Sequence, residues 1–103
     1  MIDLKQAQDV ANLIFGLSEP HRIRIVEILR SGSRNVTELA TLLDAEIVNV
    51  SHHLGVMRLS GLVLADKRGR FVNYSLNPKY FNNENSKAIT MDLGWCRIEL
   101  PHH

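Results

Sequence analysis

Cysteine is almost absent from this sequence of 103 residues, in which Cys96 is the only one. A single thiol excludes a disulfide framework and a cysteine-only zinc site within one chain, and it fits a reducing compartment such as the cytoplasm. No stretch approaches the roughly 20 apolar residues of a membrane span, so we expect no membrane segment. The N-terminus, with Asp3 and the polar run Gln6–Asp9, does not resemble a signal peptide.

A prevailing charge is also missing, because 12 Lys and Arg stand against 11 Asp and Glu, for a net charge of +1. This balance excludes a strongly basic, histone-like mode of binding nucleic acid, but it leaves room for a local basic patch. We find no Ser-His-Asp arrangement, no phosphate-cradling glycine loop and no paired carboxylates, and therefore predict no enzyme. The length permits one domain over residues 1–103, and a core this small leads us to expect a homodimer.

Helical spacing dominates the first part of the chain. Residues 1–17 predict a helix with Asp3 as N-cap, Gly16 near its end and two apolar stripes, one for the domain and one for a second subunit. The stripes are Leu4, Ala7, Ala11 and Ile14, and then Val10, Leu13 and Leu17. A second helix follows, with Ser18 as candidate cap and Pro20 in its first turn, and its apolar residues place it in the core. We interpret most of the nearby arginines as solvated surface: Arg22, Arg24, Arg30 and Arg34.

A short helix and a longer one come next, separated by a brief polar turn at 44–46. The short helix begins near Asn35 or Thr37, and the longer one runs from about Ile47 to Leu59. We expect the short helix to bury Leu39, Leu42 and Leu43, and the longer one to bury Ile47, Val50, Leu54 and Met57. The outer face of the longer helix carries Val48, Asn49, Ser51 and His52.

After Gly61 the apolar period changes from 3.6 to two, which predicts a β-hairpin. Apolar residues alternate with polar or small ones on both sides of a turn at 66–70: Leu62, Leu64, Val72, Tyr74 and Leu76. The turn carries Lys67, Arg68 and Arg70, so the hairpin has a cationic tip.

Three helices, a turn-linked fourth helix and a hairpin are the order of a winged helix-turn-helix, a mainly α fold with a β-hairpin (α+β). An α-helix fits the major groove of DNA, where Val48 can meet a thymine methyl and where Asn49, Ser51 and His52 can reach base edges. Four cations are candidates for the DNA backbone or the minor groove: Arg58, Lys67, Arg68 and Arg70. Glu46 places a negative charge near the start of the same helix, where it repels phosphate but favours the helix dipole.

Several short motifs lie in one ungapped register. They are LSEPHRI at 17–23, VTELA at 36–40, VSHHL at 50–54, MR at 57–58, SGLV at 60–63, KRGR at 67–70 and YSL at 74–76. Through them the stretch Leu17–Leu76 resembles the ArsR/SmtB family of bacterial winged-helix repressors. The resemblance implies a dimer that represses transcription from a palindromic double-stranded DNA operator and is released by an inducer, often a metal.

The family's metal ligands are not matched. Its Cys-x-Cys pair in the third helix corresponds here to Ala40 and Leu42, and no Asp-x-His pattern follows Pro78. Adjacent His52 and His53 differ by about 100° around a helix and make a poor chelating pair. His53 lies beside the inner face of its helix, and we interpret it as a structural residue rather than a base reader. We therefore expect no metal site, and the position after the His-Leu pair, usually lysine in the family, is Gly55.

Residues 77–103 form a C-terminal extension in which asparagines disfavour a helix. Alternation favours a strand at Met91–Leu100, interrupted by Gly94, that can cross to a second subunit. We expect Cys96, Ile98 and Leu100 on one face and Leu93 and Trp95 on the other, while His102 and His103 are native residues or the remainder of a purification tag.

The main hypothesis is a sequence-specific DNA-binding regulator, a dimeric cytoplasmic repressor with no cofactor and an unidentified effector. Residues 1–17 would be the dimer helix, 18–76 the DNA-binding core and wing, and 77–103 the extension. Two alternatives stay open: a winged-helix module that binds another protein and no DNA, and a thiol- or metal-responsive repressor in which Cys96 is the redox site.

Overall fold

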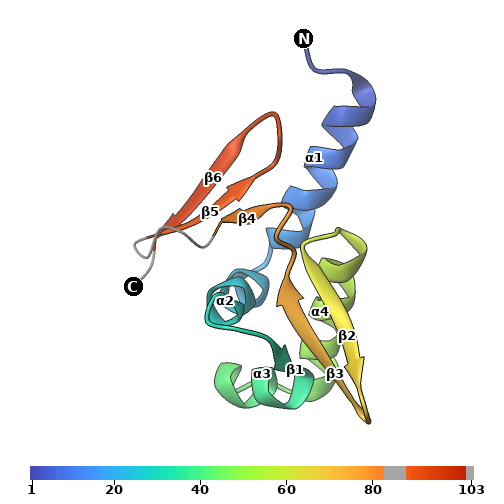
Figure 1. Ribbon diagram of the computed structural model, residues 1–103, viewed down its shortest axis with the longest axis vertical. Helices are drawn as coiled ribbons and strands as arrows, with labels where there is room; N and C mark the ends of the chain where they lie inside the picture. Colours follow the sequence, from blue (N-terminus) through green and yellow to red (C-terminus); the bar gives the residue numbers. More distant parts are fainter. Residues whose placement is uncertain (83–87, 102–103) are drawn as a thin grey trace.

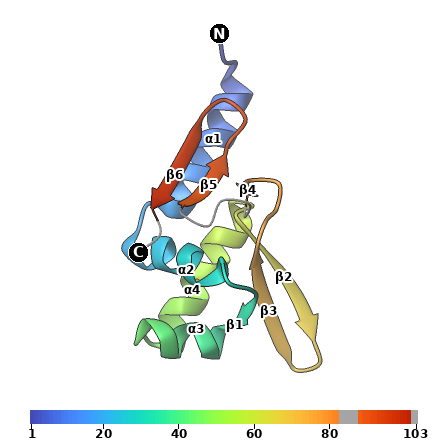
Figure 2. The same ribbon diagram turned by 60° about the vertical axis from the view of Figure 1, so that its left-hand side comes forward.

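A computed structural model describes residues 1–82 and 88–101. Helices form the first half of the chain and two small antiparallel sheets the second (Figure 1). The first helix extends from one end of the molecule and a long hairpin from the other (Figure 2). In chain order the elements are α1 (Leu4–Leu17), α2 (Pro20–Leu29), β1 (Arg34–Asn35), α3 (Val36–Leu43), α4 (Ile47–Leu59), β2 (Val63–Arg68), β3 (Phe71–Leu76), β4 (Phe81–Asn82), β5 (Ala88–Asp92) and β6 (Arg97–Pro101).

The starts of α1 and α2 follow capping chemistry. Asp3 caps α1 and forms a reciprocal capping box with Gln6, as predicted. The N-cap of α2 is Glu19, whose carboxylate accepts hydrogen bonds from two backbone N–H groups, with Pro20 directly after it. The prediction of Ser18 as this cap is wrong, because its hydroxyl instead donates to the Phe15 carbonyl at 2.8 Å and closes the end of α1.

The two predicted stripes of α1 lie on different faces. Val10, Leu13 and Leu17 are buried, whereas the other stripe is exposed to solvent, with Leu4 at 74%. Gly16 lies near the end of the helix, as predicted, where a Cβ would stand 2.6 Å from the Leu62 side chain. The glycine therefore lets α1 approach the segment after α4 closely.

The core lies between α2, α3 and α4 and extends to the segment that leads into β2. Its fully buried members are large aliphatic side chains, among them Ile25, Leu39, Leu54, Met57 and Leu62. Two residues expected in the core are exposed, Leu42 at 54% and Ile47 at 50%. They lie at the end of α3 and the start of α4, and Ala40 takes the buried position on α3 instead.

The first sheet has the order β1-β3-β2, and its hairpin is the wing of a winged helix-turn-helix. Arg68 pairs with Phe71, which leaves a loop of Gly69 and Arg70, shorter than the predicted turn at 66–70. Gly69 has a φ of +62° at the first loop position, the pattern of a type II′ turn whose twist suits a hairpin. The predicted α+β winged fold is confirmed.

The second sheet has the order β4-β5-β6 and contains the extension. The single strand predicted at Met91–Leu100 is wrong, because Gly94 adopts a φ of +86° and turns the chain between β5 and β6. Met91 and Leu93 are both buried, so Leu93 faces the core rather than lying opposite the half-buried Cys96 and Ile98. Strand β5 pairs with β4 on one side and β6 on the other, both of its own chain. The expectations for the Leu100 side chain, His102 and His103 lie outside the described residues.

Candidate nucleic-acid interface

The turn between α3 and α4 sets the angle of the helix-turn-helix. Asp44 ends α3 in the left-handed conformation with a φ of +51°. The Ala45 N–H donates to the Ala40 carbonyl and the Asp44 N–H to the Thr41 carbonyl, at 3.0 and 3.2 Å. This is a Schellman motif, in which both hydrogen bonds satisfy carbonyls that the helix end would leave open. The chain can therefore start α4 at Ile47 after a turn of only three residues.

The outer face of α4 is fully open. Val48 is 76% exposed, and Asn49, Ser51 and His52 are exposed as well. On the opposite face Val50, Leu54 and Met57 are fully buried. A Cβ placed on Gly55 would meet nothing within 4 Å, so the open face continues for two helical turns. Its side chains include an amide, a hydroxyl, an imidazole and an apolar group, all of which can contact base edges in the major groove.

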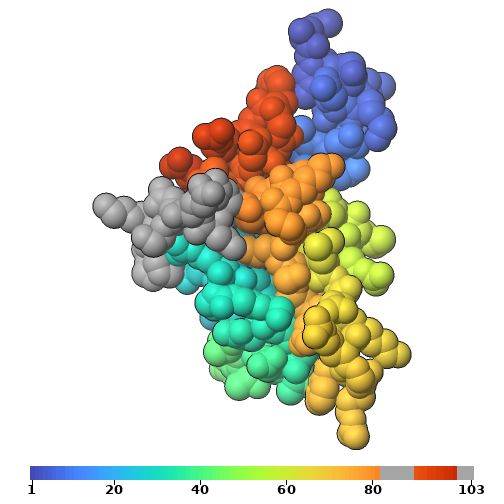
Figure 3. Space-filling view, viewed as in Figure 1, coloured from blue at the N-terminus to red at the C-terminus, as the bar shows by residue number. Residues whose placement is uncertain are grey.

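The wing presents its cations at the same end of the molecule. Lys67 and Arg68 lie at the end of β2, and Arg70 lies in the loop; all three are exposed. The wing tip and the α3–α4 turn both point away from the N-terminal end of α1 in the two ribbon views, and the wing stands out from the surface (Figure 3). Arg68 also contacts Asp66, with 2.8 Å between Nε and Oδ2, so this guanidinium is partly engaged already.

Arg58 is placed apart from the other predicted contacts. It lies in the last turn of α4 and is exposed. Ten residues separate it from Val48, which corresponds to about 15 Å along the helix axis. Because Arg58 follows Ser51 by seven residues, it shares that side of the helix and would meet DNA further along the backbone.

Three polar side chains beside the wing were not predicted from the sequence as candidate DNA contacts. Ser33, Asn73 and Ser75 line a hollow of about 420 Å³ together with Asp66 and Arg68. Asn73 and Ser75 alternate along β3, which is the period-two signal by which they could have been found. Hydroxyl and amide groups at this place can donate to phosphate oxygens next to the wing cations.

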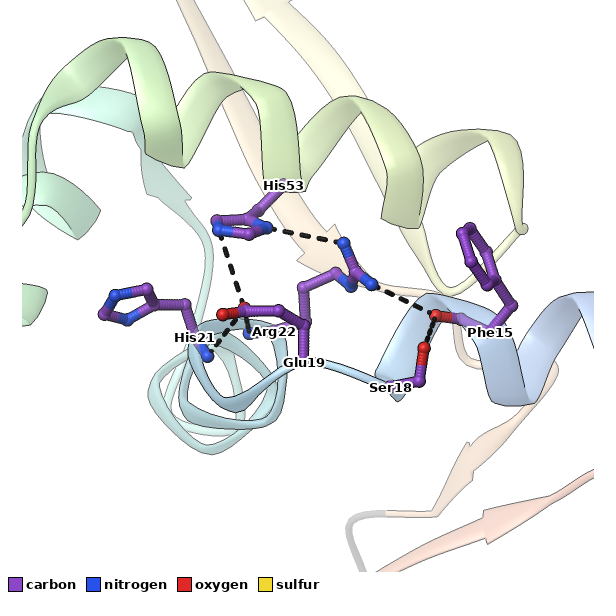
Figure 4. A network of polar contacts seen from close by, with 6 residues as sticks. All are labelled: Phe15, Ser18, Glu19, His21, Arg22 and His53. Carbon is purple, nitrogen blue, oxygen red and sulfur yellow. Dashed lines mark hydrogen bonds and ion pairs between the residues drawn. The ribbon is translucent and has the colours of Figure 1, made fainter.

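Behind the open face, α4 is tied to α2 by a polar network (Figure 4). Arg22 is only 7% exposed, so its interpretation as solvated surface is wrong. Its guanidinium lies 3.4 Å from Nδ1 of His53, and Nε2 of His53 lies 3.5 Å from Glu19. The His21 ring stands 5.7 Å from the His53 ring. His53 thus has the structural placement that the sequence predicted, between two charged side chains of α2.

The electrostatics of this network favour a neutral imidazole. Burial lowers the pKa of His53 below its ordinary value of 6.5, and the nearby positive charge of Arg22 acts in the same direction, while Glu19 opposes both. Because Arg22 can only donate, Nδ1 must accept, and the remaining proton belongs on Nε2 towards Glu19. That tautomer uses both ring nitrogens.

Two further predictions concern ligands. Among residues 1–82 and 88–101 no group of three or more His, Cys, Asp or Glu side chains is placed to hold a metal ion. Cys96 is a free, half-buried thiol in the turn between β5 and β6, and its carbonyl accepts a hydrogen bond from Leu93 at 2.9 Å.

Within the described part of the chain no helix is long and apolar enough to cross a bilayer.

A helix-turn-helix with one open polar helix face and a cationic hairpin beside it defines the class of winged-helix DNA-binding proteins. The sequence profile of the bacterial regulatory protein arsR family matches residues 19–64. The regulator NmtR of Mycobacterium tuberculosis is 41% identical over 75 residues, which cover 73% of this chain and 62% of NmtR. This chain belongs to the arsR family.

Solved structures agree with this assignment. The transcriptional repressor BigR from Xylella fastidiosa superposes with a TM-score of 0.64 at 35% identity, over 73% of this chain and 76% of BigR. A homodimeric winged helix-turn-helix DNA-binding domain from Mycobacterium bovis, described as a possible ArsR-family regulator, gives 0.69 at 27% identity, over 77% and 75% of the two chains. The matched relatives are named as transcriptional regulators, not as enzymes.

Proposed function

We propose that this chain is a sequence-specific DNA-binding repressor that acts as a homodimer in the cytoplasm, where bacterial DNA lies. The observation that carries the proposal is the shared placement of the open α4 face and the wing cations at one end of the molecule. A helix places its outer residues in the major groove, and cations beside it neutralise phosphates. Family membership supports the same function.

In this proposal α4 supplies direct readout. Asn49, Ser51 and His52 contact base edges, and Val48 packs on a thymine methyl. Lys67, Arg68 and Arg70 position the domain on phosphates or in the adjacent minor groove, and Arg58 contacts the backbone beyond the readout residues. Because phosphate contacts release counterions, binding weakens steeply as salt rises.

The second copy is expected on the exposed stripe of α1. This stripe presents Leu4 and Ile14, which are 74% and 44% exposed, together with Ala11. Phe15, next to the stripe and 59% exposed, lines a hollow of about 300 Å³ with Leu59, which is 92% exposed. Exposed apolar residues gathered on one element are typical of a protein interface. The homodimeric state of the structural relative from Mycobacterium bovis supports a second copy of this chain as the occupant.

Selection of duplexes from a random library, followed by fluorescence anisotropy at several salt concentrations, tests the proposal. We expect an inverted-repeat sequence whose half-sites lie about one helical turn apart, or a multiple of it. The logarithm of the affinity should fall linearly with the logarithm of the salt concentration. No enriched sequence and no salt dependence would instead favour a winged-helix module that binds another protein.

A further inference from the structure

The network behind α4 joins three helices at His53, directly after the last proposed readout residue (Figure 4). The Phe15 carbonyl of α1 accepts a hydrogen bond from Arg22 at 3.3 Å, and the guanidinium lies 5.5 Å from the centre of the Phe15 ring. The same guanidinium contacts His53 of α4. His53 directly follows His52, which is exposed, and their ring centres are 5.9 Å apart. The orientation of the readout face is therefore tied to α1 and α2 through Arg22 and His53.

We propose that Arg22 and His53 are positioning residues, which hold α4 in its DNA-binding orientation only while the His53 imidazole is neutral. This inference rests on the proposed DNA-binding function. Neither side chain is expected to touch DNA, because Arg22 is 7% exposed and the His53 side chain 14% exposed.

The geometry explains why the neutral ring is required. In the neutral tautomer Nδ1 accepts from Arg22 and Nε2 faces Glu19. Protonation places a second N–H in front of the guanidinium and sets two positive charges against each other. This repulsion removes a contact that Arg22 cannot easily replace. Its Nε is already buried without a hydrogen-bond partner among the described residues.

Among the described residues, the charged and titratable groups that act on His53 come from two helices and their caps. Glu19, the N-cap of α2, and His21 and Arg22 of α2 face it, and His52 neighbours it on α4, while α1 contributes the Phe15 carbonyl through Arg22. Glu19 alone favours the protonated ring, and its carboxylate is also engaged by the N–H groups that it caps. Burial lowers the pKa of His53, so the neutral form dominates above pH 6.5 and is lost as the pH falls further.

The test has to separate His53 from the imidazole beside it. Protonation of His53 breaks the contact with Arg22 and weakens binding. His52 lies next to His53 on α4 and is itself a proposed DNA contact, so His52→Gln removes this second imidazole before His53 is varied.

The test compares three full-length proteins: wild type, His52→Gln, and His52→Gln combined with His53→Gln. Glutamine carries one acceptor and one donor that do not titrate, so it imitates the neutral imidazole. Affinity for the duplex selected with the wild-type protein is measured by anisotropy from about pH 8 to about pH 5.5 at constant salt. Circular dichroism at each pH shows that the protein remains folded.

We expect His52→Gln to lose about threefold or more in affinity over this range, and the double variant to change by less than about twofold. Parallel profiles of the two variants, or a loss that coincides with unfolding, would overturn the positioning role. The result is separable from failure of the proposed function, because a protein that does not bind DNA shows no affinity for the selected duplex already at pH 8.

Discussion

The two ends of the molecule carry the same kind of sheet but expose different chemistry. Each end has a three-stranded antiparallel sheet built around one hairpin. In the wing, β2 is buried only at Val63, and its exposed end carries cations. In the extension, Met91 is fully buried and Leu93 is 7% exposed, so that hairpin is packed onto the body. The topology is shared, and the placement of apolar side chains decides whether a hairpin stands free or joins the core.

The helices at the two ends of the molecule, α4 and α1, also expose different chemistry. Helix α4 exposes short polar side chains beside the wing, whereas α1 exposes the large apolar residues Leu4, Ile14 and Phe15. A polar, cationic surface suits a polyanion, and an apolar surface suits another protein. This small domain therefore separates its two proposed interfaces along its length.

The largest effect is expected from truncation in the packed hairpin. Met91→Ala removes a fully buried side chain and should lower the free energy of unfolding by about 2–5 kcal/mol. The matched change in the wing, Phe71→Ala at a side chain 51% exposed, should cost less than about 1 kcal/mol. Urea unfolding followed by circular dichroism measures both. Equal losses would mean that the two hairpins are not packed differently.

A charge placed on the α1 stripe should disrupt the dimer. Ala11→Glu buries an unpaired carboxylate against the second copy, which should raise the dimer dissociation constant at least about a hundredfold, or ~2.7 kcal/mol. Analytical ultracentrifugation gives the value. The same substitution at exposed Ala65 of the wing is the control and should leave the dimer intact. A dimer that survives Ala11→Glu would place its interface elsewhere.

The wing arginines should differ from each other. Arg70→Ala should reduce operator affinity about fivefold and lower the magnitude of the salt slope by about 0.9. Arg68→Ala should reduce the affinity less, because Asp66 already holds its guanidinium at 2.8 Å. Anisotropy titrations over a series of salt concentrations supply both quantities. An unchanged slope for Arg70→Ala would remove the wing from the proposed interface.

The smallest effect is expected at the start of α4. Glu46 is its exposed N-cap and makes no side-chain capping hydrogen bond. Glu46→Gln removes a charge that repels phosphate and should strengthen operator binding about twofold, at a cost to helix stability below about 1 kcal/mol. The gain should disappear at high salt in the same anisotropy assay. Weaker binding at every salt concentration would show that Glu46 is not near the backbone.

Local patterns were enough to locate the helices and the wing. Period and capping predicted α4 at Ile47–Leu59, Asp3 as the cap of α1, and a hairpin after Gly61. They did not predict the exposure of Leu42 and Ile47, because an apolar residue at a helix end is buried only if another element covers it. The prediction of a single strand at Met91–Leu100 was wrong because of Gly94. A glycine in a strand pattern marks either an interruption of the strand or a turn, and the local sequence does not distinguish the two.

The candidate interface was also predictable only where its residues share one helix or strand. The proposed DNA contacts on α4 and the wing lie on single elements, where residue spacing alone says which side chains share a face. Arg22 lies on α2, but its burial depends on Phe15 before it and His53 far after it. No spacing rule within α2 distinguishes it from Arg24, which is exposed.

The local elements, the family and the open helix face follow from the amino-acid sequence alone, because periodicity, capping and turn preferences act over a few residues. The tertiary structure decided which end of each hairpin is free, how α1 divides its two stripes, and that Arg22 and His53 meet behind the readout face. These features depend on burial between segments far apart in the chain. Burial is a property of the packed molecule, and no single segment carries it.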